Sequence, residues 1–219
     1  MDMNVEQLLD KVIDSFSEID YIRTGDIPAI DLYMDQVTTF MDSKLKNTTR
    51  KPDEDKILTK TMINNYAKSN LLPPPEKKKY SKEHLLILIF IYHFKNILTM
   101  KDIETFLKPI TDQYFQADSS LTISQIYDEV CSFEKEHSEL LQNEIVQMYE
   151  HSTHTFSDVS GEDREVLQTF SFICFLCFDI YRKKQLIESL IDSLPSHVEE
   201  ANSKEKKKKE KQTGHHEKN

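Results

Sequence analysis

The chain has 219 residues with only 3 glycines, and its formal net charge is -10 at pH 7. Loops that cradle phosphate groups need several glycines close together, so the sequence excludes P-loop, Rossmann and kinase-type folds. Scarce glycine with abundant Leu, Ile, Lys and Glu favours helices. The acidic N-terminus is unlike a signal peptide, and the three cysteines form no disulfide framework, so we expect a cytoplasmic protein.

Positive charge gathers in the middle of the chain. Residues 44–101 carry 13 basic and 5 acidic side chains, whereas residues 1–43 and 102–194 have net charges of -8 and -12. A basic block between acidic segments indicates a surface for nucleic acid. A solvated lysine-rich face is the alternative interpretation.

Apolar residues recur at helical spacing in two N-terminal segments. The first spans residues 4–20. The second runs from Ile27 to Asp42, with Asp26 as its N-cap and Pro28 in its first turn. The polar residues 43–57 predict a loop or linker.

A short polar helix is predicted from Lys60 to Ser69, with Thr59 as its N-cap. Its buried side should hold Ile63 and either Tyr66 or Ala67. Asn70 tolerates the left-handed backbone that ends a helix, and three consecutive prolines then stiffen the turn.

Two further helices follow a lysine-rich tip at residues 77–79. Tyr80 can pair in a minimal two-stranded wing. Ser81 caps a helix that is apolar on nearly every side from Leu85 to Phe94, and such helices are normally central. Thr99 caps the next helix, which Pro109 is expected to break.

The C-terminal part predicts two long helices. Ser120 or Thr122 opens the first, and a polar stretch at residues 152–163 turns the chain. The second runs from Arg164 to Leu194. Its apolar middle, Phe170 to Phe178, is too short to cross a bilayer, so we expect it to be buried against other helices or a second subunit. The tail has no apolar residues to bury and should be disordered.

Several short motifs between Thr59 and Ile103 together resemble a known DNA-binding module. They are Thr59, Ile63-Asn64-Asn65-Tyr66, Leu71-Leu72-Pro73-Pro74-Pro75, Tyr80-Ser81, Leu85 and Leu98-Thr99-Met100-Lys101-Asp102-Ile103. Over about residues 59–107 they resemble the winged helix-turn-helix of MerR-type regulators. The pattern resembles even more closely, over about residues 20–120, an uncharacterised bacterial family, domain of unknown function family 1836.

DNA recognition needs cations for phosphates and amide or guanidinium groups for base edges. The phosphate candidates are Lys60, Lys68, Lys77, Lys78, Lys79 and Lys82. Asn64 and Asn65 can bond adenine in the major groove, or they are ordinary surface residues. Tyr66 is either a phosphate donor, as the resemblance implies, or a core ring. Thr61 and Tyr80 complete the predicted DNA-binding set.

Other candidate sites have weaker support. Cys174 and Cys177 are spaced like a redox or metal pair, but they lie in an apolar run that favours buried structural thiols. Three histidines lie near glutamates in a polar region where a metal site is possible: His137, His151 and His154. No residue pattern predicts catalysis, so we expect neither an enzyme nor a cofactor.

We therefore predict an all-α protein in which a MerR-like winged helix-turn-helix module precedes a two-helix C-terminal region. Its expected parts are an N-terminal helix (1–25), the module (26–115), a C-terminal helical region (116–194) and a disordered lysine-rich tail (195–219). The predicted function is a homodimeric transcriptional regulator that binds double-stranded DNA, with no membrane association and an effector that the sequence does not identify. A protein-interaction module that kept the fold without specific DNA binding is the alternative.

Overall fold

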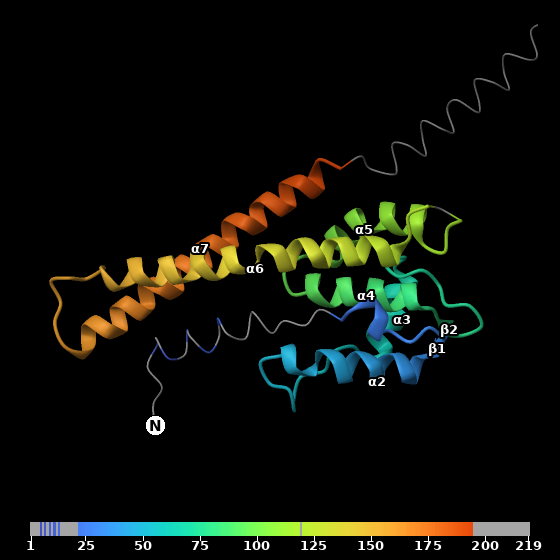
Figure 1. The fold of residues 1–219 in the computed structure, drawn as a ribbon, viewed down its shortest axis with the longest axis horizontal. Coiled ribbons are helices and arrows are strands. Elements are labelled where there is room, and N and C mark those ends of the chain that lie inside the picture. Colours follow the sequence, from blue (N-terminus) through green and yellow to red (C-terminus); the bar gives the residue numbers. More distant parts are fainter. Residues whose placement is uncertain are drawn as a thin grey trace, which may run out of the picture.

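The computed structural model describes residues 22–118 and 120–194, together with Val5, Gln7, Leu9, Lys11 and Ile13, which are helical. The described residues are mostly helical with one two-stranded sheet, so the all-α prediction is confirmed at that level (Figure 1). Most of the predicted N-terminal helix and all of the predicted tail at residues 195–219 lie outside the described residues.

The second predicted helix begins later than its sequence pattern indicates. A single 3-10 turn, η1 (Thr24–Asp26), is followed by strand β1 (Leu32–Tyr33) and then by α2 (Met34–Leu45). The prediction that Asp26 caps a helix from Ile27 is therefore wrong. Ile27 is extended and buried, and Leu32 is buried in a strand. These two residues are therefore apolar because they are buried in the core, although they are not helical. The Gln36 side chain accepts a hydrogen bond from the Tyr33 N–H at 2.9 Å and caps α2.

The short polar helix is confirmed as α3 (Lys60–Lys68). The Met62 N–H donates to the Thr59 hydroxyl at 3.2 Å, as an N-cap should. Ile63 and Tyr66 are the buried residues of α3. Asn70 adopts a φ of 58°, the left-handed conformation expected of it, and ends the helix.

Helix α4 (Lys82–Phe94) is the centre of the core, because it is buried on nearly every side from His84 to Ile89. It follows strand β2 (Lys79–Tyr80), which pairs antiparallel with β1. Figure 1 shows α4 between α2 and α6.

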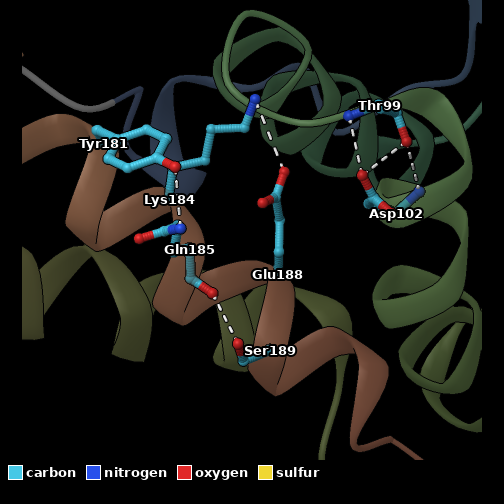
Figure 2. Close-up of polar contacts among 7 residues, drawn as sticks. All are labelled: Thr99, Asp102, Tyr181, Lys184, Gln185, Glu188 and Ser189. Carbon is cyan, nitrogen blue, oxygen red and sulfur yellow. Dashed lines mark hydrogen bonds and ion pairs between the residues drawn. The ribbon is translucent and has the colours of Figure 1, made fainter.

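Helix α5 (Met100–Tyr114) continues through Pro109, so the predicted break is wrong. Ile103, Leu107 and Thr111 are buried on both sides of the proline and hold the helix in place despite its missing N–H. The predicted cap is confirmed: Thr99 and Asp102 form a reciprocal capping box (Figure 2).

The last two helices form an antiparallel hairpin that projects beyond the core (Figure 1). Thr122 caps α6 (Ile123–Thr153), and α7 (Glu162–Asp192) returns along it. The first turns of α6 join the core through Ile123 and Tyr127, and the end of α7 joins it through Ile191. Within the described part of the chain, no helix is long and apolar enough to cross a membrane.

Candidate nucleic-acid interface

The outward side of α3 carries five of the predicted site residues, all exposed. They are Lys60, Thr61, Asn64, Asn65 and Lys68. Tyr66, in contrast, is buried in the core, and burial raises the pKa of its phenol. Of the two roles considered for Tyr66, its position favours the core ring.

The lysine-rich tip is a tight hairpin turn. The Lys79 N–H donates to the Glu76 carbonyl at 2.8 Å, and Lys77 and Lys78 between them have φ values of 48° and 66°. Two consecutive positive φ values are the signature of a type I′ turn, which normally takes Asn-Gly or Gly-Gly. Both lysine side chains are exposed. The sequence predicted a tip here but not the turn type, because lysines are unusual in it.

The hairpin and α3 meet at the junction of β1 and α2. The Lys79 ammonium lies 5.3 Å from the centre of the Tyr33 ring, and two residues further on the Asp35 carboxylate forms an ion pair with Lys60. These two contacts bring the start of α3 and the hairpin onto one surface. The sequence does not mark Tyr33 and Asp35 as members of this surface, because a two-residue strand leaves no periodic pattern.

Asp35 also reduces the positive charge of this surface. Its partner Lys60 is one of the predicted phosphate-binding residues, and both side chains are well exposed. Exposed ion pairs are weak, so Lys60 can exchange this carboxylate for a phosphate at little cost.

The two remaining predicted residues lie at the base of the hairpin. Tyr80 is buried, and burial raises the pKa of its phenol. Lys82, in the first turn of α4, is partly buried. Because Tyr80 packs edge-on against the His84 ring at 5.5 Å, its position is that of a core residue that anchors β2.

His84 is the buried polar side chain beneath the hairpin. Its Nδ1 accepts a hydrogen bond from the Ser81 N–H at 3.0 Å, so it caps α4 in its neutral form. Burial lowers the pKa of His84, although the carbonyls of Pro74 and Pro73 and the charges of Asp31 and Glu76 oppose this shift. Its Nε2 makes no hydrogen bond of ordinary geometry among the described residues.

Residues 22–130 match the family described as domain of unknown function (DUF1836). The resemblance to this family that was inferred from the motifs is therefore confirmed. The DUF1836 match begins just before η1 and ends in the first turns of α6, so it contains the whole candidate interface and nearly all of the core. No curated protein and no solved structure matched the chain.

The other candidate sites lie outside the DUF1836 segment. Cys177 is exposed and Cys174 is half-buried, so the prediction of two buried thiols is wrong for Cys177. His137 and His154 bond backbone carbonyls of their own helix turns, at 2.7 and 2.8 Å. Among the residues that the structure describes, no group of three or more His, Cys, Asp or Glu is arranged to hold a metal ion.

Proposed function

We propose that the chain is a cytoplasmic DNA-binding regulator whose residues 26–115 act as a MerR-like winged helix-turn-helix, and that it is a binding protein rather than an enzyme. The observation that carries this proposal is the shared surface of α3 and the lysine hairpin. A helix with an exposed amide-and-lysine face, beside a hairpin tipped by lysines, offers both kinds of contact that DNA recognition requires.

In this proposal α3 enters the major groove. Asn64 and Asn65 then face base edges, where an asparagine amide can bond N6 and N7 of adenine. The hairpin lysines Lys77 and Lys78 contact the phosphate backbone to one side, and Lys60 and Lys68 contact it at the ends of α3. Tyr33, exposed beside Lys79, adds a hydroxyl within the same surface.

A homodimer completes the proposal. One α3 helix and one two-residue hairpin tip provide a small surface, whereas two copies related by a two-fold axis read two half-sites. The parts of α6 and α7 beyond the DUF1836 segment are the natural place for the contact between copies, because much of their apolar surface is exposed.

Electrophoretic mobility shift against genomic fragments, across a salt series, tests DNA binding. We expect the logarithm of the binding constant to fall linearly with the logarithm of salt concentration, by about 0.9 per phosphate contact. Lys77→Glu with Lys78→Glu should weaken binding to every fragment about equally and make the slope shallower. The matched control, Lys135→Glu with Arg182→Glu, makes the same total change in charge on α6 and α7 and should leave the salt slope unchanged.

A protein-interaction module is the second candidate function, favoured by the acids at the same surface. Asp35 pairs with Lys60, and Asp31 is exposed just before β1. If the full chain retains no fragment even at low salt, DNA binding is excluded and the surface would instead suit a protein partner of mixed charge.

A further inference from the structure

Helix α7 carries a continuous apolar stripe that faces solvent. Val166, Phe170, Ile173 and Ile180 are 67, 60, 52 and 62% exposed, and Cys177 between them is exposed as well. The five positions are separated by four, three, four and three residues. This is the a/d spacing of a heptad repeat, the pattern with which one helix packs along another.

The stripe is distinct from the face of α7 that packs against α6. That inner face is marked by Phe172, which is buried and lies 5.4 Å from the Tyr149 ring of α6. Gln168 bonds the Thr153 carbonyl at the end of α6 from the same side. The contact between α6 and α7 therefore does not use the heptad stripe.

The area of the exposed surface is large for a monomer. Tyr181 flanks the stripe and is 58% exposed. Since an aromatic side chain buries about 150–250 Å², Tyr181 and Phe170 alone offer on the order of 200 Å². The aliphatic members bring the patch toward the roughly 800 Å² per partner of a stable interface.

Residues of opposite charge lie at the two ends of the stripe. Asp163 lies three residues before Val166, and Lys184 lies four residues after Ile180, so both continue the heptad spacing. Lys184 is partly exposed and forms an ion pair with Glu188 of its own helix, at 3.7 Å (Figure 2). The midpoint between Asp163 and Lys184 falls at Ile173 and Cys174.

We propose that α7 pairs with α7 of a second copy in an antiparallel orientation, centred on Ile173. In this register Asp163 of each copy meets Lys184 of the other, and Phe170 packs opposite Cys177. A parallel pair would instead place Asp163 beside Asp163 and Lys184 beside Lys184, and like charges across an interface disfavour that arrangement. The inference specifies the contact of the dimer proposed above, and its tests measure association without DNA.

Sedimentation of the full chain over a concentration series tests the interface. We expect a dimer for the natural sequence and a dissociation constant raised by roughly tenfold or more in Lys184→Glu, because the dimer then contains two pairs of like charges, each formed by the substituted position 184 of one copy and Asp163 of the other. Adding Asp163→Lys to Lys184→Glu should restore association. The control Arg182→Glu makes the same charge change two residues from Lys184 but off the stripe, and should have little effect.

Cysteine cross-linking tests the orientation. In a chain with Cys131, Cys174 and Cys177 replaced by Ala, Val166→Cys mixed with Ile180→Cys should form an intermolecular disulfide, because these positions face each other only in the antiparallel register. Ile180→Cys alone should form none. Efficient cross-linking of Ile180→Cys with itself would establish a parallel pair and overturn the proposal.

A monomeric full chain would also overturn the proposal, since another part of the same chain would then cover the stripe. This result is separable from failure of the proposed function. A dimer that binds no DNA would support the α7 interface and contradict the proposed regulator. A monomer that binds DNA would contradict the interface and support DNA binding.

Discussion

At the scale of single residues, His84 couples pH to the base of the hairpin. It is held neutral by burial, and its Nδ1 accepts the Ser81 N–H only while that nitrogen carries no proton. A histidine whose pKa is lowered by folding takes up its proton first in the unfolded chain. Its contribution to stability is therefore complete above the unfolded pKa of about 6.5 and is lost as pH falls below that value.

We predict that the free energy of unfolding falls on acidification from about pH 6.5, by up to about 1.4 kcal/mol per pH unit from His84 alone. His84→Gln should remove this part of the pH dependence, because Gln at this position completes an ordinary capping box with Ser81 and does not titrate. Urea unfolding at several pH values measures it, with the exposed His137→Gln as control. Equal slopes in the natural chain and in His84→Gln would contradict the prediction.

The second prediction at this scale concerns the exposed side chains of Asn64 and Asn65. Both are exposed on α3, so replacing either with Ala should leave the melting temperature nearly unchanged. If an amide makes a bidentate adenine contact, its loss should cost about 1–3 kcal/mol at that base and relax sequence preference. Binding measured on a library of fragments checks this, and an equal loss on every fragment would argue against base recognition.

At the scale of elements, the hairpin tip holds two lysines in a backbone conformation that favours glycine and asparagine. We predict that Lys77→Asn with Lys78→Gly stabilises the chain by about 1 kcal/mol. The two left-handed lysines together cost about 2 kcal/mol, and the greater backbone freedom of Gly in the unfolded chain offsets part of the gain. The same change should weaken DNA binding and make its salt dependence shallower, if these lysines contact phosphate. Thermal unfolding and mobility shift, measured on one preparation, separate the two effects.

The elements also show where sequence could and could not predict the structure. Thr59, Asn70, Thr99 and Thr122 marked real helix ends, because caps act through hydrogen bonds local to the sequence. The strand β1 was missed, since its pairing with β2 is set by residues almost fifty positions away. The continuation of α5 through Pro109 was also missed, because it depends on tertiary packing. The candidate interface was predicted on α3 and the hairpin, but its link through Tyr33 and Asp35 required the fold.

At the scale of the whole molecule, opposite charges occupy different parts of the chain. Residues 44–101 have a net charge of +8, whereas residues 102–194, which form most of α5 and all of α6 and α7, have a net charge of -12. Figure 1 shows the α6–α7 hairpin projecting away from α3 and β2. If the chain binds DNA as proposed, phosphates would repel this hairpin, so the charge distribution would favour an orientation with α3 and the lysine tip toward DNA and with α7 away from it.

The link between dimer and DNA gives the last prediction. If two modules bind together, disrupting the α7 contact should leave one module and half of the phosphate contacts, so the log–log salt slope should fall to about half. Ile173→Asp suits this test, because Ile173 is more than half exposed within one chain and its loss should spare the fold. The mobility-shift salt series is repeated with this variant and with Arg182→Glu as control. An unchanged slope in a chain shown to be monomeric would mean that a single module makes every phosphate contact, and that the second copy serves another purpose.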